Sequence, residues 1–168
     1  AVIVYPDMYY PSTGLFIARD DRLLLAVKAG DNADSHNHND TGSFTVYKDG
    51  RPFFIDVGVE SYTKKTFSPQ RYEIWTMQSA YHNLPTINGC MQQDGEAYSA
   101  QNVCSRFSDT VCEISMDIAQ AYPQECGVSS YQRTASLIKG QEILIRDSFT
   151  PAKDNVILNF MTYEKPVC

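Results

Sequence analysis

The sequence lacks the features of a nucleic-acid-binding or membrane-spanning protein. No run of basic residues is longer than Lys64-Lys65, and the formal net charge is −6. An acidic surface repels nucleic acid and anionic lipid unless a local basic patch overrides it. The sequence contains no signal peptide and no apolar run long enough to span a bilayer. We therefore expect neither nucleic acid nor a membrane as a partner.

The chain also lacks the marks of a natural beginning and end. It starts at Ala1 rather than at Met, and it stops at Cys168 directly after a strand-like run. A length of 168 residues suits one domain. We predict that residues 1–168 form a single domain excised from a longer chain. The missing targeting signals then say nothing of where the parent protein is located.

Cysteine is present without the patterns that give it a function. The five cysteines are an odd number, and no Cys-x-x-Cys occurs, so neither a disulfide framework nor a cysteine zinc site is indicated. Cys104 and Cys112 flank a predicted turn at Ser108-Asp109. A tight hairpin there pairs residue 104 with 113 and residue 105 with 112, so the two thiols do not face each other. We expect reduced and mostly buried thiols.

Helical periodicity is missing as well, because no segment keeps a helical pattern over three turns. Short β-like runs separated by turn residues take its place. Asp49-Gly50, a strong hairpin signal, separates runs at 43–48 and 51–59, and Lys139-Gly140-Gln141 separates 131–138 from 142–149. The segment 70–81 is left open as a helical turn or an irregular strand. The pattern predicts an all-β, antiparallel β-sandwich, with further strands at 1–5, 14–18, 23–29, 111–119 and 155–163.

The three histidines are the most informative residues that are present. His36 and His38 stand one residue apart in the segment DSHNHND, and His82 follows later. On an extended backbone His36 and His38 point to the same face, together with Asp34 and Asp40. This spacing allows both histidines to bind one metal ion. It also allows one histidine to bind a metal while the other contacts a substrate. A pair of surface histidines is the alternative, because the pattern is short.

Asp56 strengthens the prediction of a metal site. It is a single acid in the apolar run FFIDVG, and burying an unpaired charge is costly. With a turn at 49–50, residue 48 pairs with 51 and residue 43 with 56, which brings Asp56 to the end of the ladder near the histidine pair. Two histidines and one aspartate with an open fourth position form a common zinc site.

A cupin-like metal enzyme is one alternative, since Gly30 followed by His36-x-His38 matches the start of the cupin pattern. That pattern next requires a Glu three or four residues after the second His. This chain has no Glu there, and Gly42 lies at that place. The later half of the pattern is also absent around His82. The cupin hypothesis is therefore the weaker one.

Two ordered blocks, SHNHNDTGSFTVYKDGRPFFIDVGVESY and RYEIWTMQSAYHNLPTINGCMQQ, resemble the β-sandwich part of the heparinase II/III-like polysaccharide lyases. The family pattern has an H-x-H-x-D entrance, a turn with Gly, an apolar strand with D-x-G and a Tyr, then Arg, an aromatic residue, a small hydroxyl residue, H-N, N-G and Gln. The matching positions are His36, His38, Asp40, Gly50, Asp56, Gly58, Tyr62, Arg71, Trp75, Ser79, His82, Asn83, Asn88, Gly89 and Gln92 or Gln93.

The resemblance implies a supersandwich-like fragment of a larger protein that pairs an N-terminal α/α toroid with the β-sandwich. It implies zinc bound by His38, Asp56 and His82, and a catalytic His36 that faces the cleft between the domains. The implied substrate is an acidic, uronic-acid-containing polysaccharide or oligosaccharide, cleaved by β-elimination. Other catalytic groups come from the toroid, so we expect the isolated fragment to bind metal but not to cleave. Bacterial secreted, periplasmic and cytoplasmic locations all stay open.

A non-catalytic carbohydrate-binding or interaction module is the alternative from another functional class. It would retain the fold without requiring that His36 face a cleft.

Arg71 is a candidate substrate-binding residue, because arginine holds carboxylate or sulfate with two bonds. A structural pairing of Arg71 with Glu73 or Asp56 is favoured slightly. Trp75, the only tryptophan, is expected in the core rather than on a sugar-stacking surface.

Overall fold

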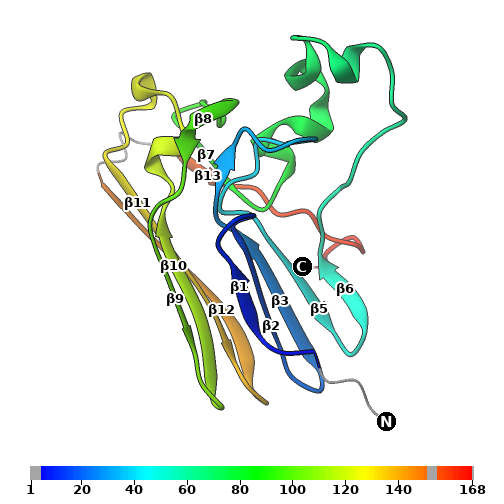
Figure 1. Ribbon diagram of the computed structural model, residues 1–168, viewed down its shortest axis with the longest axis vertical. Helices are drawn as coiled ribbons and strands as arrows, with labels where there is room; N and C mark the ends of the chain where they lie inside the picture. Colours follow the sequence, from blue (N-terminus) through cyan, green and yellow to red (C-terminus); the bar gives the residue numbers. More distant parts are fainter. Residues whose placement is uncertain (1–4, 151–154, 168) are drawn as a thin grey trace.

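Two antiparallel β-sheets lie face to face in the computed structural model, which describes residues 5–150 and 155–167 (Figure 1). The first sheet has five strands in the order β1-β2-β3-β5-β6. Burial alternates along its longer strands, so that one face is buried and the other is partly exposed to solvent. Its strands are β1 (Met8–Tyr10), β2 (Leu15–Arg19), β3 (Leu23–Lys28), β5 (Phe44–Lys48) and β6 (Arg51–Phe54).

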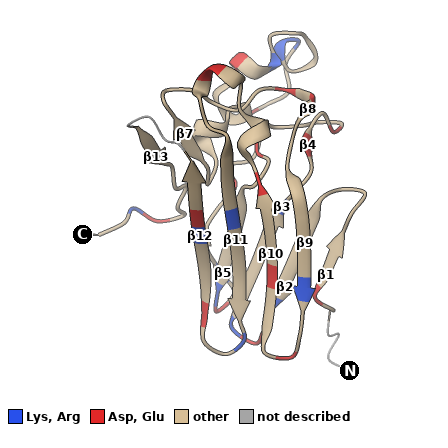
Figure 2. Cartoon of the chain, turned by 90° about the vertical axis from the view of Figure 1, so that its left-hand side faces the viewer, with Lys and Arg blue, Asp and Glu red and all other residues tan. Residues whose placement is uncertain are grey.

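The second sheet has four strands in the order β12-β11-β10-β9. They are β9 (Gln101–Phe107), β10 (Val111–Asp117), β11 (Ser130–Ile138) and β12 (Glu142–Thr150). Charged residues occupy only short segments of these strands (Figure 2). Two small sheets pair β4 (Asp31–Asn32) with β8 (Gly95–Ser99) and β7 (Pro85–Ile87) with β13 (Val156–Leu158), and both lie toward one end of the sandwich (Figure 1).

The core fills the space between the two large sheets. Phe16, Leu25 and Phe44 from the first sheet are buried with Ile114 and Leu137 from the second. Burying large apolar side chains from both sheets supplies the main driving force for docking them. The predicted antiparallel β-sandwich is confirmed. Within 5–150 and 155–167 there is no α-helix, and no helix is long and apolar enough to cross a membrane.

The hairpin at Asp49-Gly50 forms as predicted but with a different register. Both turn residues have positive φ, 51° and 74°, and Lys48 pairs with Arg51. An irregularity between Val46 and Tyr47 then shifts the ladder, so that Val46 pairs with Phe54. Strand β6 ends there, and the predicted pairing of residue 43 with 56 is wrong. Asp56 instead lies in the segment that follows the strand.

The hairpin between β9 and β10 also departs from the predicted register. Cys112 pairs with Phe107 and Ser115 with Cys104, rather than residue 113 with 104. Cys90, Cys104, Cys112 and Cys126 are all free, as expected. Cys112 and Cys126 are buried, but Cys104 is exposed. Cys168 lies outside the described residues.

The segment that the sequence left open consists of consecutive single-turn 3₁₀-helices. They are η1 (Lys65–Phe67), η2 (Arg71–Glu73), η3 (Trp75–Met77) and η4 (Ser79–Tyr81). Two more, η5 (Ala119–Ala121) and η6 (Gln124–Cys126), precede β11. Strands β1, β4, β7 and β8 were not predicted, whereas the predicted strand at 155–163 shortens to β13. Most of the predicted strand at 1–5 lies outside the described residues.

Candidate metal centre

Three segments that are distant in sequence meet at one end of the five-stranded sheet. His38 lies in the loop between β4 and β5, Asp56 just beyond β6, and His82 directly after η4. One potential ligand atom from each of these three residues lies within 4.8 Å of the other two. The structure therefore brings together the three residues that the sequence predicts as metal ligands. The distances are close enough for small side-chain rotations to bring all three onto one ion.

His82 is fully buried and its ring has a defined orientation. Its Nε2 lies 3.1 Å from the main-chain carbonyl oxygen of Thr76. A carbonyl can only accept a hydrogen bond, so Nε2 carries the proton and Nδ1 of the neutral ring presents a lone pair. A histidine that donates one ring N–H to a carbonyl and turns the other nitrogen inward has the usual arrangement of a metal ligand.

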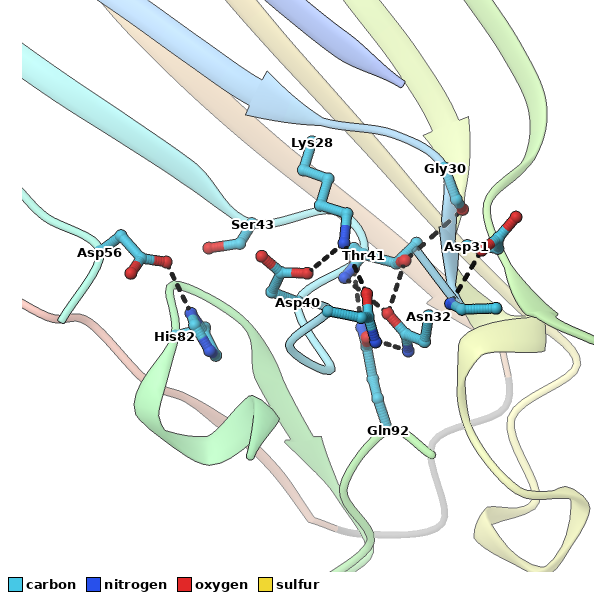
Figure 3. A network of polar contacts seen from close by, with 12 residues as sticks. Lys28, Gly30, Asp31, Asn32, Asp40, Thr41, Ser43, Asp56, His82 and Gln92 are labelled. Atoms are coloured by element: carbon cyan, nitrogen blue, oxygen red, sulfur yellow. Dashed lines mark hydrogen bonds and ion pairs between the residues drawn. The ribbon is translucent and has the colours of Figure 1, made fainter. Parts of the chain in front are cut away.

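Asp56 supplies the strongest test of whether these residues fit a metal. Its Oδ2 lies 3.1 Å from His82 Nδ1 (Figure 3), and Nδ1 has no hydrogen-bond donor or acceptor of good geometry within the described chain. Two lone pairs facing each other repel, so the contact requires a positive charge at this point. Either a second proton on His82 or a cation shared with His38 supplies that charge. The set of two nitrogens and one oxygen suits zinc.

The protonation of the other two residues favours ligation near neutral pH. Burial and the neighbouring His82 ring lower the pKa of His38, so its imidazole stays neutral to a more acidic pH than usual. Burial opposes ionisation of Asp56, but positive charge on the facing His82 ring and the N–H of Gly58, 2.6 Å from Oδ1, outweigh burial and lower the pKa of Asp56. Both groups therefore hold the protonation state that a metal requires.

His36 does not share a face with His38, and this prediction is wrong. Residues 34–40 form turns rather than a strand, and His36 has a left-handed backbone with φ of 61°. Its exposed ring meets Tyr62 edge-on at 6.2 Å between centroids, whereas the His38 ring lies 5.3 Å from His82. The two imidazoles therefore lie in different surroundings, His36 at the surface and His38 beside the His82 ring.

The loop between β4 and β5, residues 33–43, carries His36 and His38 and is called the histidine loop. Arg71 holds this loop in place through main-chain contacts. Its Nε and Nη2 donate to the carbonyl of Asn37 at 3.0 and 2.9 Å, and Nη1 donates to the carbonyl of Thr66 at 2.9 Å. Neither of the two anticipated acid partners is used, since Glu73 pairs with Lys65 instead. Substrate binding by Arg71 stays a prediction.

A polar network supports the loop from its other side (Figure 3). Lys28 Nζ lies 2.6 Å from Asp40 Oδ1, and buried Gln92 donates to the carbonyl of Thr41 at 2.7 Å. Gln92 also accepts a bond from Asn32 at 3.0 Å. The sequence left Gln92 and Gln93 as alternatives, and the structure places Gln92 in this network. Satisfied buried networks of this kind hold a loop in one conformation.

Arg133, which was not predicted, connects the site to the second sheet. Arg133 of β11 is only 2% exposed, and its Nη1 donates to the carbonyls of Gly42 and Asn83 at 2.9 and 2.8 Å. Its other nitrogens form a two-bond pair with Asp147 of β12. Asn83 directly follows His82, so Arg133 helps to position this candidate ligand. In the alternation of β11, Arg133 shares a face with Tyr131, Ala135 and Leu137, all of which are buried. That pattern could have placed Arg133 inward, although it does not identify the carbonyls that Arg133 binds.

Trp75 is not a core residue, and this prediction is wrong. Its side chain is 42% exposed, and its Nε1 donates to Glu60 Oε1 at 2.8 Å. The 3₁₀-helix η3 turns Thr76 and Met77 inward instead. The turn therefore buries Thr76 and Met77 and leaves the indole of Trp75 at the surface.

Comparison with known proteins assigns the family. The sequence profile described as heparinase II/III-like, C-terminal, matches residues 4–164. The chain therefore belongs to the heparinase II/III-like family and corresponds to its C-terminal domain. The cupin-like alternative is thereby removed. Among curated proteins, none matches this chain.

Solved structures share the fold at low sequence identity. A heparan sulfate lyase HepC mutant from Pedobacter heparinus is 18% identical, with a TM-score of 0.69 over 89% of this chain. A heparinase III with methylated lysines is 19% identical, with a TM-score of 0.65 over 88%. The chain spans 23% and 22% of the lengths of these two proteins.

Proposed function

We propose that this chain is the β-sandwich domain of a polysaccharide lyase that cleaves uronic-acid-containing glycans by β-elimination, with zinc held by His38, Asp56 and His82. The observation that carries the proposal is the convergence of these three residues beside an exposed His36, in a domain of the heparinase II/III-like family. The names of the similar structures, heparan sulfate lyase and heparinase, support an acidic glycan as substrate.

The reaction breaks the bond between C4 and its glycosidic oxygen. A base removes the proton on C5, a double bond forms between C4 and C5, and the departing oxygen takes up a proton. The C5 proton is weakly acidic until the charge on the neighbouring carboxylate is stabilised, so positioned donors or cations are needed. His36 is exposed and has no hydrogen bond among the described residues, so its ring is free to accept a proton or hold the carboxylate.

Zinc in this proposal supplies a fixed positive charge that joins three chain segments. Elimination needs no water, so activation of a water molecule is not the function assigned to the site. His38 and His82 orient the loop that carries His36, while Arg71 positions the same loop through Asn37. An N-terminal α/α toroid in the parent protein contributes the remaining catalytic groups, so the isolated domain binds zinc without cleaving polysaccharide.

Zinc content tests the metal site directly. Untagged protein is analysed for bound metal, and His82→Ala is compared with His36→Ala as a matched histidine control. We expect about one zinc per chain in the wild type and in His36→Ala, and a strong loss in His82→Ala. Unchanged zinc content and melting temperature in His82→Ala would show that the three-residue site is wrong.

Lyase activity tests the catalytic part of the proposal. The full-length parent is incubated with heparin-like, hyaluronan-like and alginate-like substrates, and the ultraviolet absorbance of an unsaturated uronate is followed. We expect product with at least one substrate, and its loss in His36→Ala at unchanged zinc content. No product from any of them would favour a non-catalytic carbohydrate-binding module.

A further inference from the structure

Cys90 and Cys126 are distant in the sequence but lie in contact, and their thiols share a hydrogen bond. Cys126 is fully buried in the core, and Cys90 packs against the same core from a partly exposed position. Neither belongs to the candidate metal centre, which is the only group of three or more metal-binding side chains among residues 5–150 and 155–167. A pair of thiols without further metal ligands has one characteristic reaction, which is the formation of a disulfide.

The backbone around Cys90 is held by a tight turn. Cys90 follows Asn88-Gly89, whose φ values of 50° and 77° are typical of a two-residue hairpin turn. The N–H of Cys90 donates to the carbonyl of Ile87 at 2.8 Å, and the N–H of Ile87 donates to the carbonyl of Cys90 at 3.1 Å. The turn therefore holds Cys90 opposite the end of β7.

Three hydrogen bonds fix the segment 85–93, which contains Cys90, against the segment 119–126, which contains η5 and η6. Two of them lie before Cys90 in the sequence and one lies after it, with lengths of 2.6, 2.6 and 3.2 Å. They join Tyr122 Oη to the carbonyl of Pro85, Asn88 Nδ2 to that of Cys126, and the N–H of Gln93 to that of Ala121. The two thiols therefore cannot move apart without breaking these bonds, and a disulfide between them requires no rearrangement of the two segments.

We propose that Cys90 and Cys126 are a site of reversible oxidation, where a low-molecular-weight disulfide such as oxidised glutathione joins them by a disulfide bond. The bond would tie the end of β7 to η6 and close a loop that contains β8, β9 and β10. Gln92, two residues after Cys90, donates to the carbonyl of Thr41 in the histidine loop, so the bond would also fasten one support of that loop. The inference is independent of the proposed function, because it requires neither a metal nor a glycan.

The partly exposed Cys90 reacts first. Its thiolate attacks one sulfur of the oxidant, a mixed disulfide forms, and the other half of the oxidant leaves and takes up a proton. Cys126 then loses its proton and attacks the sulfur of Cys90, which releases the second half of the oxidant. Two protein thiols are thereby oxidised by two electrons, and one disulfide oxidant is reduced to two thiols. Burial and the Cys90 thiol raise the pKa of Cys126, so Cys126 is the second rather than the first residue to react.

Peptide mapping identifies which cysteines are joined. The chain is incubated with an excess of oxidised glutathione, free thiols are alkylated under denaturing conditions, and the protein is digested after Lys, Arg and Glu without reduction. The described cysteines then fall in different peptides, which are separated at Glu96, Arg106 and Glu113. We expect one disulfide, between the peptides of Cys90 and Cys126, and glutathione on the exposed Cys104.

The melting temperature measures what the bond does for the fold. Oxidation should raise it on the order of 5–10 °C in the wild type, because a cross-link restricts the unfolded chain, and dithiothreitol should reverse the rise. Cys104→Ala is the matched control and should keep the rise, whereas Cys90→Ala should lose it. Cys90 is partly exposed, so Cys90→Ala should fold, and its melting temperature under reducing conditions measures any other cost of the substitution.

Glutathione on Cys104 serves as the sign that the oxidant was active. If Cys104 carries glutathione while Cys90 and Cys126 are both alkylated, the proposal is overturned. Glutathione that stays on Cys90, or a disulfide between any other two cysteines, would overturn it as well. Joined peptides of Cys90 and Cys126 without a rise in melting temperature would support the oxidation site and contradict its stabilising effect.

Discussion

At the scale of single residues, the candidate metal ligands were predictable from the sequence, but the groups that hold them in position were not. Histidine is rare in this chain, and an aspartate in an apolar run needs a partner, so the histidine pair, Asp56 and His82 could be grouped from the sequence. The choice of His38 rather than His36 as the ligand came from the family resemblance. The contacts of the Thr76 carbonyl and the Arg133 guanidinium could not be predicted, because a main-chain contact leaves no mark on residue type. The positive φ of His36 likewise has no sequence signature, and it overturned the same-face prediction.

Replacing Arg133 should be among the most destabilising single changes in this chain. Arg133→Met leaves the Asp147 carboxylate and the carbonyls of Gly42 and Asn83 without their donor in a buried region. Removing one partner of a buried ion pair typically costs about 3–5 kcal/mol. Denaturant unfolding measures the loss. Arg106→Met, at an exposed pair with Glu113, is the control and should change stability by less than about 1 kcal/mol.

At the scale of elements, strands with strict alternation were predicted and short ones were missed. Strands β2, β3, β10 and β11 alternate between buried and less buried positions along most of their length. Strand β7 begins at Pro85 and has only three residues, so it offers no period to detect. The register after Asp49-Gly50 failed because a ladder irregularity depends on contacts of the whole sheet rather than on the turn.

Gly42, at the end of the histidine loop, should tolerate no side chain. Its φ is +89°, and a Cβ there would lie 2.8 Å from Ile118 Cγ2. Gly42→Ala therefore combines backbone strain with overpacking and should cost about 2–4 kcal/mol. Gly50→Ala is the matched control, because φ there is +74° but no atom lies within 4 Å. It should cost only about 1–2 kcal/mol by denaturant unfolding.

The ion pair of Asp7 and Lys139 links the segment before β1 to the turn between β11 and β12. Burial opposes ionisation of Asp7, but bonds from Lys139 and from the N–H of Arg19 outweigh it and lower the pKa of Asp7. Since the folded pKa is below the unfolded value, the stabilisation is present above about pH 4 and is lost as pH falls through the folded pKa.

Asp7→Asn should therefore destabilise the protein at pH 7 by about 1–2 kcal/mol, and the difference from the wild type should shrink toward pH 2. Thermal unfolding between pH 2 and pH 7 measures it. Asp49→Asn, at a pair whose side chains are 66% and 51% exposed, should show almost no difference. A constant difference for Asp7→Asn across this range would contradict the assignment.

At the scale of the whole molecule, zinc should stabilise the folded state by linking three separate chain segments. Its three proposed ligands come from segments before β5, after β6 and after η4, and the unfolded chain does not hold them together. At free zinc about 100 times the dissociation constant, the stabilisation amounts to ~2.7 kcal/mol. Chelation should therefore lower the melting temperature. The effect should be lost only at a pH below the ordinary histidine pKa of about 6.5, because the lowered pKa of His38 keeps that ring neutral to more acidic pH. Calorimetry with and without chelator measures both; His82→Ala should be insensitive to chelation.

The bonds of Arg133 also bear on when, during folding, the proposed metal centre can form. Arg133 and Gly42 are 91 positions apart in the chain, so their contact forms only after the two sheets have docked. Contacts of such long sequence separation are characteristically late and slow events in folding. Zinc would then find its ligands in place only after the rate-limiting step, so it should slow unfolding while leaving the refolding rate unchanged. Half-life in the folded state, rather than speed of maturation, is what this protein would gain from its metal.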